Sequence, residues 1–216
     1  MLVVKGVNKS INHNLILSNI ELTLKPGVVY GFVGRNGSGK TMLFRALSGL
    51  MKIDSGEIIY QDKRLHKDFP VLPRLGITLE NAGLYPEFTG LKNLQLLAKL
   101  NKIIGDEEIK DAIRRVGLDP NDKRIYKKYS LGMKQRIVLA QAIMEKPEVI
   151  MLDEPTNSLD EVGVSQIRQV IKEEKQRGAM ILLASHNKED IELLADDVFY
   201  LDKGRLVNNE VLKHAE

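Results

Sequence analysis

The sequence predicts an α/β fold with a mostly parallel sheet at its core, and two observations support this prediction. Short apolar runs over Val28–Val33, Val149–Leu152 and Met180–Ala184 alternate with helical patterns. Strands of nearly continuous apolar character are typical of a parallel sheet that helices cover on both faces. The chain has 216 residues, which at ~150 residues per domain favours a single domain over 1–216.

The N-terminal section is predicted to form short strands separated by turns. Strands are expected over Leu2–Val7, Ile16–Leu24 and Glu57–Tyr60, with Pro26-Gly27 as a tight turn. One helix, expected over 39–50, interrupts these strands. This section therefore combines short strands with one helix that begins near Gly39.

The middle of the chain, from about 91 to 146, is predicted to be helical. Apolar residues recur there at intervals of three and four, which is the spacing of one helix face. Another helix is expected over 161–177, and a strand pair over 197–211 is expected to turn at Lys203-Gly204. Strands and helices thus alternate through the second half of the chain, as a parallel sheet requires.

Composition excludes several classes of function. The chain has no cysteine, so disulfides, thiolate zinc sites and cysteine nucleophiles are excluded. Its formal net charge is +3, whereas a protein that coats nucleic acid usually carries a larger positive excess, so no nucleic-acid partner is expected. Lys5 and Gly6 interrupt the N-terminal apolar residues, so no signal peptide is predicted. No apolar run approaches the ~18 residues of a membrane-spanning helix.

The sequence GRNGSGKT at 34–41 is the first chemical signal. It fits the pattern G-x-x-x-x-G-K-[ST] between a predicted strand and a predicted helix. Its backbone N–H groups must approach phosphate oxygens closely, and side chains at the glycine positions would obstruct them. The lysine places a cation beside the β- and γ-phosphates, and the threonine hydroxyl is a ligand for Mg²⁺. The predicted ATP-binding residues of this loop are Gly34, Arg35, Asn36, Gly37, Ser38, Gly39, Lys40 and Thr41.

The sequence EVIMLDEP at 148–155 is the second signal. Its apolar residues predict a buried strand that ends in Asp153 and Glu154, at the edge of the sheet where ligands bind in open α/β folds. Asp153 is predicted to hold Mg²⁺, and Glu154 to polarise an attacking water as general base. Taken alone, the pair also fits acidic residues in an ordinary turn, and the phosphate loop favours the catalytic interpretation.

Three further motifs follow in the second half of the chain. YSLGMKQR occupies 129–136, NSLD occupies 157–160, and Ser185-His186 follow the last buried strand. In this order, the motifs resemble those of the ATPase subunit of an ATP-binding cassette (ABC) transporter. YSLGMKQR is similar to a variant of the signature motif LSGGQ-x-QR, NSLD to the D-loop, and His186 to the switch histidine. The resemblance covers nearly the whole chain.

The resemblance implies a composite site between two subunits. The signature residues of one subunit contact the γ-phosphate of ATP bound to the other, Asp160 reaches across the dimer, and His186 contacts the γ-phosphate as part of the catalytic set. Independently of this role, Ser130 has the residue type of a helix N-cap. The signature residues expected to bind ATP are Ser130, Leu131, Gly132 and Met133.

The chain departs from the family pattern at two positions. Ile11 stands where the family usually has an aromatic residue that stacks on adenine, so Ile11 is expected to offer only apolar contact. Glu80 stands where the family usually has the glutamine of the Q-loop, and the bacitracin- and lantibiotic-type exporters resemble this chain in that respect. Glu80 is therefore expected to be a catalytic residue and a ligand of Mg²⁺, although an exposed charge at a strand end also fits it.

The resemblance implies a P-loop NTPase of the ABC ATPase type, with a mixed sheet core, an antiparallel β lobe and a helical lobe inserted at about 87–146. It implies ATP and Mg²⁺ as cofactors, a second ABC ATPase subunit and a separately encoded transmembrane permease as partners, and a cytoplasmic location at the inner face of the membrane. The expected function is to power export of a drug or an antimicrobial peptide. The alternative is a non-transport ABC ATPase that acts in DNA repair, translation or cofactor assembly.

Overall fold

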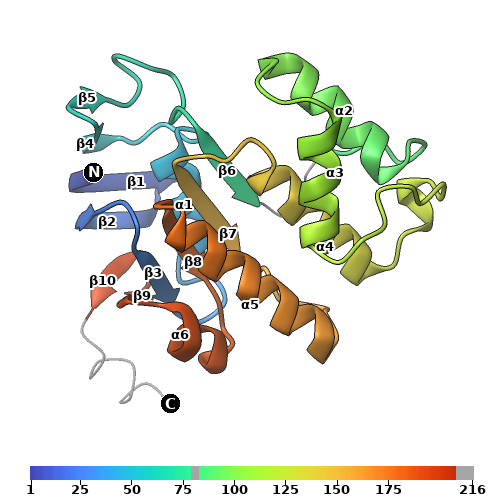
Figure 1. Cartoon of the computed structure of the whole chain (residues 1–216). Coiled ribbons are helices and arrows are strands. Elements are labelled where there is room, and N and C mark those ends of the chain that lie inside the picture. Colours follow the sequence, from blue (N-terminus) through green and yellow to red (C-terminus); the bar gives the residue numbers. More distant parts are fainter. Residues whose placement is uncertain (79–82, 208–216) are drawn as a thin grey trace.

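The computed structural model describes residues 1–78 and 83–207. Within them, the strands form two sheets, one of four strands in the order β2-β1-β4-β5 and one of six strands in the order β10-β9-β3-β8-β7-β6. Figure 1 shows the two sheets together on one side of the molecule and the helices α2, α3 and α4 gathered on the other. The site described below lies between these two parts.

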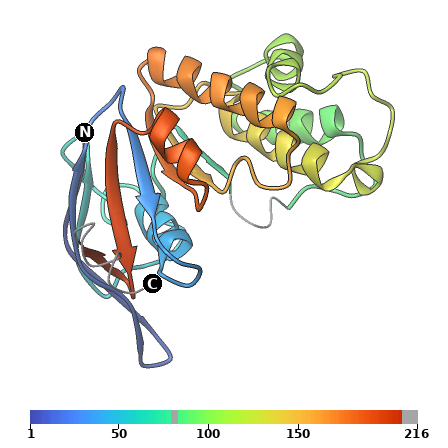
Figure 2. The same cartoon turned by 90° about the horizontal axis from the view of Figure 1, so that it is seen from below.

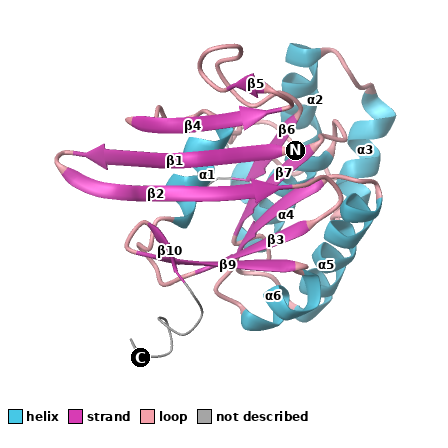
Figure 3. Cartoon of the chain, turned by 90° about the vertical axis from the view of Figure 1, so that its left-hand side faces the viewer, coloured by secondary structure: helices cyan, strands magenta, loops and turns pink. Residues whose placement is uncertain are grey.

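The four-stranded sheet is the antiparallel lobe. Its hairpin has a two-residue turn in which Asn12 and His13 both adopt positive φ, at 48° and 64°, as the type I′ turn of a tight hairpin requires. The two strands of the hairpin extend further toward this turn than the sequence predicts, and Figure 3 shows them as the longest strands of the molecule. The strands are β1 (Leu2–Ile11), β2 (Asn14–Leu24), β4 (Ser55–Tyr60) and β5 (Lys63–Arg64).

The six-stranded sheet has a parallel core, with β10 antiparallel at its edge. Because its central strands run in the same direction, their carboxyl ends meet at one edge of the sheet. The sequence did not predict β6, a short strand beside β7. The strands are β3 (Val29–Val33), β6 (Leu75–Thr78), β7 (Val149–Asp153), β8 (Met180–Ala184), β9 (Asp197–Asp202) and β10 (Arg205–Val207).

The central strands are buried on both faces, and their residues alternate between two hydrophobic cores. In β7, Met151 packs into one core with Phe44 of α1 and strands of the four-stranded sheet. Ile150 and Leu152 point the other way and pack with Ile137 of α4 and residues of α5. The continuous apolar runs of the sequence therefore reflect two faces that are both covered, as in other parallel sheets.

The helices cover both faces of the six-stranded sheet. Helix α1 lies between the two sheets, whereas α4, α5 and α6 pack on the opposite face, and Figure 2 shows this separation from below. Of the helices in the described ranges, none is both long and apolar enough to cross a membrane. The helical elements are α1 (Lys40–Ser48), α2 (Gly90–Asn101), α3 (Asp106–Arg115), the 3₁₀ turn η1 (Tyr126–Lys128), α4 (Leu131–Ile143), α5 (Glu161–Gln176) and α6 (Lys188–Leu194).

The helical region predicted from about 91 to 146 is divided into α2, α3 and α4. Helix α2 begins at Thr89, whose side chain accepts a hydrogen bond from the backbone N–H of Lys92, and ends at Lys102, which adopts the left-handed conformation with φ of 55°. The sequence did not predict α6, which is only 7 residues long. This helix begins directly after His186 and Asn187, and its position matters for the site.

Candidate nucleotide-binding site

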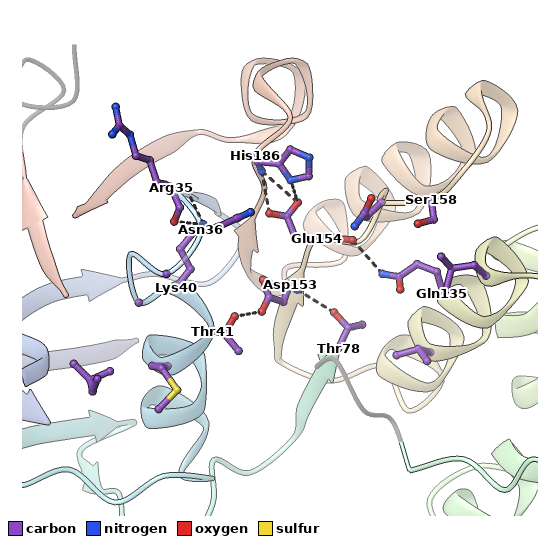
Figure 4. A pocket seen from close by; sticks show the side chains of 18 of the residues that line it. Arg35, Asn36, Lys40, Thr41, Thr78, Gln135, Asp153, Glu154, Ser158 and His186 are labelled. Atoms are coloured by element: carbon purple, nitrogen blue, oxygen red, sulfur yellow. Dashed lines mark hydrogen bonds and ion pairs between the residues drawn. The ribbon is translucent and has the colours of Figure 1, made fainter. Parts of the chain in front are cut away.

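A large cavity lies at the carboxyl ends of the parallel strands. Its volume is about 1430 Å³, and it extends from the phosphate loop to the first turn of α4. Figure 4 shows Lys40 and Thr41 on one side of this cavity, Asp153, Glu154 and His186 in the middle, and Gln135 on the far side. The fold therefore brings together residues from four separate motifs of the sequence.

The phosphate loop connects β3 to α1 and points the N-terminus of α1 into the cavity. No described side chain caps this helix, whose N-cap is Gly39 with φ of 110°. The N–H groups of the first turn and the positive end of the helix dipole are thus available to an anion. The side chain of Lys40 is buried, and its Nζ donates to the carbonyl oxygens of Gly34 at 2.7 Å and Arg35 at 3.3 Å. Lys40 holds the loop closed around its own ammonium group.

Gly34 is required by close packing inside the loop. A Cβ at this position would lie 2.3 Å from the carbonyl oxygen of Leu201 and 2.5 Å from the Oγ of Ser38. The hydroxyl of Ser38 is buried and has no hydrogen-bond partner within the described part of the chain. A buried hydroxyl that has no partner among the described residues fits a site for a polar ligand such as a phosphate chain.

A hydroxyl and a carboxylate form the candidate metal site. The Oγ1 of Thr41 donates to the Oδ2 of Asp153 at 2.5 Å, and the N–H of Asp153 donates to the Oγ1 of Thr78 at 3.0 Å. Among the described residues, no group of three or more acidic or histidine side chains could hold a metal ion by itself. One carboxylate and one hydroxyl fit Mg²⁺ that arrives with a nucleotide, because Mg²⁺ retains waters and uses phosphate oxygens as its other ligands.

Glu154 is held in an uncommon backbone conformation at the centre of the cavity. Its φ is 51°, in the left-handed region, and its N–H donates to the carbonyl oxygen of Ala184 at 2.9 Å. Its carboxylate accepts from the backbone N–H of His186 at 3.1 Å and lies 2.7 Å from the Nδ1 of the same residue. The left-handed conformation costs energy for a residue other than glycine. Such residues cluster at functional sites, where surrounding contacts compensate for the strain. The structure therefore joins two of the predicted catalytic residues directly.

The helical side of the cavity contributes residues that the sequence did not single out. The Nε2 of Gln135 in α4 donates to the carbonyl oxygen of Glu154 at 3.1 Å. The Nζ of Lys134 lies 5.7 Å from the centre of the Tyr126 ring, and burial raises the pKa of the Tyr126 phenol. Gln135 and Lys134 both occur in YSLGMKQR, so the signal was present, but only the fold shows that Gln135 reaches Glu154.

The signature residues lie at the N-terminus of α4. The Oγ of Ser130 accepts a hydrogen bond from the N–H of Met133 at 3.2 Å, which confirms the prediction that Ser130 is an N-cap. Leu131 lines the cavity and is 68% exposed. Of the four predicted signature residues, Ser130, Gly132 and Met133 do not line the cavity of their own chain. This arrangement leaves the helix N-terminus at the surface beside the cavity.

Asp160 caps α5 within its own chain. Its Oδ1 accepts from the N–H of Gly163 at 3.0 Å and from Arg136 of α4 at 2.9 Å. Its side chain is nevertheless 71% exposed. Arg136 thus joins the D-loop to α4, while most of the Asp160 carboxylate remains exposed to solvent.

One predicted contact, Ile11, does not line the cavity. Ile11 lies at the end of β1 and is not one of the described residues that line the cavity. Leu15 and Ile16, which follow the hairpin turn on β2, line it instead. The tight turn at Asn12 directs the chain back, so that β2 rather than the end of β1 faces the phosphate loop. Glu80 lies outside the described residues.

The doubly covered parallel sheet, the phosphate loop and the acidic end of β7 define a P-loop NTPase. A family profile described as "ABC transporter" matches residues 17–157. An uncharacterized ABC transporter ATP-binding protein of Bacillus subtilis, YybJ, is 45% identical over 210 residues, which cover 97% of this chain and 96% of that protein. The chain belongs to the ABC transporter family and is an ATPase of that family.

Relatives with more specific names are less similar. The bacitracin transport ATP-binding protein BcrA of Bacillus licheniformis is 37% identical over 97% of this chain and 67% of its own length. A dimeric solved structure of the bacterial ABC transporter cassette MJ0796 has a TM-score of 0.86 at 23% identity, and it covers 96% of this chain and 97% of that one. This structural likeness establishes the fold of the cassette, including its mixed sheet and its separate group of helices.

Proposed function

We propose that this chain hydrolyses ATP to drive export of a drug or an antimicrobial peptide through a separately encoded membrane permease. The observation that carries the proposal is the position of Glu154, which is held by His186 beside Asp153 and across the cavity from the phosphate loop. The similarity to BcrA supports transport of an antimicrobial peptide, since that protein is named for bacitracin transport. A lantibiotic transport ATP-binding protein of Streptococcus pyogenes, SrtF, is 32% identical over 96% of this chain and 89% of its own length.

The phosphate loop and the two metal-site residues bind the nucleotide. Lys40 and the free N–H groups of α1 compensate the negative charge of the phosphates. Thr41 and Asp153 would hold Mg²⁺, and Glu80 is proposed as a further ligand. Held there, Mg²⁺ would supply positive charge against the phosphoryl oxygens. Leu15 and Ile16 line the cavity and Ile11 does not, so Leu15 and Ile16 are the apolar residues proposed to contact the adenine.

Glu154 and His186 carry the catalytic step. The carboxylate of Glu154 accepts a proton from the attacking water, which increases the nucleophilicity of that water. His186 orients this carboxylate through its backbone N–H and its ring. The side chain of His186 is exposed and lines the cavity, which supports its proposed contact with the γ-phosphate.

A second ABC ATPase subunit completes each site. The N-terminus of α4, with residues 130–133, is exposed. Its backbone N–H groups would donate hydrogen bonds to a phosphate of the ATP that is bound to the opposite subunit. Asp160 faces outward from the same region. The solved structure of MJ0796 is dimeric, which supports this arrangement. The proposed location is the cytoplasmic face of the membrane, where the cassette pair is bound to its permease.

The test combines turnover with export. Glu154→Gln removes the general base, so the kcat for ATP is expected to fall about 10²–10⁴-fold while ATP still binds. In a strain that lacks this chain, the wild-type chain is expected to restore growth at higher concentrations of bacitracin or a lantibiotic, and Glu154→Gln is not. Wild-type turnover by Glu154→Gln would reject the assignment of the base. Equal growth of the two strains with every antibiotic tested would reject export.

A further inference from the structure

A buried polar cluster lies directly behind the catalytic pair. Its centre is Asp190 of α6, which is completely buried. The Oδ2 of Asp190 accepts from the Oγ1 of Thr156 at 2.5 Å, and its Oδ1 accepts from the Nε of Arg168 at 2.7 Å. Arg168 lies on α5 and also binds Glu189 at 3.0 Å. The cluster thus connects the loop after β7, the helix α5 and the helix α6.

The cluster connects the same two segments as the catalytic pair does. Thr156 follows Glu154 by two residues, and Asp190 follows His186 by four. The backbones of the two segments are joined as far as the hydrogen bond from the Glu154 N–H to the Ala184 carbonyl oxygen. Past the strand ends, side chains bridge the segments at two further places, in the cavity by Glu154 and His186 and in the interior by Thr156 and Asp190. The interior bridge therefore adds a fixed point that limits the rotation of the two segments relative to each other.

The two bridges differ in their access to water. The His186 side chain is 63% exposed, so water competes for its contact with Glu154. The carboxylate of Asp190 is out of water and is paired with a guanidinium, so its hydrogen bonds have no solvent alternative. The interior bridge is thus the more rigid of the two.

We propose that Thr156, Arg168 and Asp190 are positioning residues that hold the segment of Glu154 at the correct distance from the segment of His186. The proposal rests on the role of Glu154 as the general base. None of the three residues touches the reacting atoms, and their effect on turnover passes through the backbone of these two segments. Because catalysis depends steeply on geometry, loosening the cluster lowers kcat and leaves the phosphate loop, which binds ATP, unchanged.

A cluster that serves only folding would behave differently, and the chain offers a matched comparison. Glu174 of α5 is also a buried carboxylate, and it binds Arg115 at 2.8 Å and Arg177 at 2.7 Å. It lies on the same helix as Arg168 but does not line the cavity. Glu174→Gln removes a buried charge of the same kind without touching either catalytic segment, so it reports the cost of a lost ion pair by itself.

The experiment measures kcat, the Kd for ATP and the thermal midpoint of the full chain and of five variants. Thr156→Val keeps the shape of the side chain and removes its hydroxyl, and we expect about tenfold lower kcat with a Kd within about twofold of the wild type. Thr156→Ser keeps a hydroxyl at this position and is expected to retain most of the wild-type kcat. Asp190→Asn is expected to lower kcat at least as much as Thr156→Val, while Glu174→Gln lowers the thermal midpoint and leaves kcat unchanged. Glu154→Gln completes the set.

The outcomes separate the positioning role from the role of the base. Unchanged kcat in Thr156→Val together with an inactive Glu154→Gln overturns the positioning role and leaves the proposed function intact. A parallel loss of kcat in Asp190→Asn and Glu174→Gln overturns it as well, since general destabilisation then explains both. If Glu154→Gln retains turnover, the proposed function fails, and the positioning proposal that depends on it fails for that separate reason.

Discussion

At the scale of single residues, we expect Lys40 to contribute strongly to nucleotide affinity. Its buried ammonium group contacts two carbonyl oxygens of its own loop and faces the space where phosphates would lie. Lys40→Ala removes this charge, and hydrogen bonds to charged groups contribute about 1.5–3 kcal/mol each. We therefore expect the Kd for ATP to increase about 10- to 100-fold.

A titration with a fluorescent ATP analogue measures the Kd of the wild type and of Lys40→Ala. The thermal midpoint without nucleotide serves as the control, since it shows whether the loop still folds when the interior contacts of the ammonium group are lost. Unchanged affinity in Lys40→Ala would contradict the identification of the phosphate loop.

The apolar contact to the adenine of ATP is also decided by single residues. Leu15 lines the cavity and Ile11 does not, although both are close to the same hairpin turn. Leu15→Ala removes apolar surface worth about 1 kcal/mol, so the Kd for ATP is expected to increase about fivefold. Ile11→Ala provides the matched control and is expected to leave the Kd unchanged. The reverse pattern in the same titration would restore Ile11 as the base contact.

At the scale of elements, the N-terminus of α4 has two roles that one pair of variants can separate. Ser130 caps the helix in its own chain, and it is proposed to meet a phosphate of the opposite subunit. Ser130→Asp retains a good N-cap but adds a negative charge, whereas Ser130→Ala removes the cap at a cost of about 1 kcal/mol. We expect Ser130→Asp to keep the thermal midpoint and lose ATP turnover, and Ser130→Ala to lower both.

These measurements are thermal unfolding and steady-state ATPase activity of the same preparations. Full turnover by Ser130→Asp would show that residues 130–133 do not approach a phosphate, and Ser130 would then be only a helix cap.

The contact between Gln135 and Glu154 shows how elements combine at this site. Glu154, the proposed general base, follows directly after β7, and Gln135 of α4 donates to its backbone carbonyl oxygen at 3.1 Å. The same carbonyl oxygen also accepts from the backbone N–H of Asn157 at 3.2 Å. The position of α4 is thereby connected to the backbone of the catalytic residue.

At the scale of the whole molecule, the exposed signature helix and D-loop predict a dimer that depends on ATP. Glu154→Gln is expected to bind ATP and Mg²⁺ without hydrolysing them, so that two chains stay together with two nucleotides between them. Size-exclusion chromatography with light scattering is expected to show a doubled mass for Glu154→Gln with ATP, but not with ADP.

The double variant that adds Ser130→Asp to Glu154→Gln is the control for this experiment. It is expected to remain monomeric with ATP, because the added carboxylate repels the phosphate of the opposite subunit. A dimer of equal mass in both variants would place the interface elsewhere on the molecule.

The sequence by itself determined the features that depend on neighbouring residues along the chain. Gly34 and Lys40 are specified by the local geometry of a loop between a strand and a helix, and Asp153 by the end of a buried strand. Ser130 could be predicted as an N-cap because capping involves only the next turn of the helix. The parallel sheet followed from continuous apolar runs, since both faces of each strand are covered.

Only the tertiary structure decided which distant residues meet. The conformation of a two-residue turn determines whether Ile11 or Leu15 faces the cavity, and one step along a strand reverses the direction of a side chain. The contact of Gln135 with Glu154 and that of Thr156 with Asp190 join segments 19 and 34 residues apart, across different elements. Sequence patterns report the period of one helix or strand. Contacts between distant residues depend instead on how several elements pack, and this packing is selected by the burial and hydrogen bonding of the whole chain.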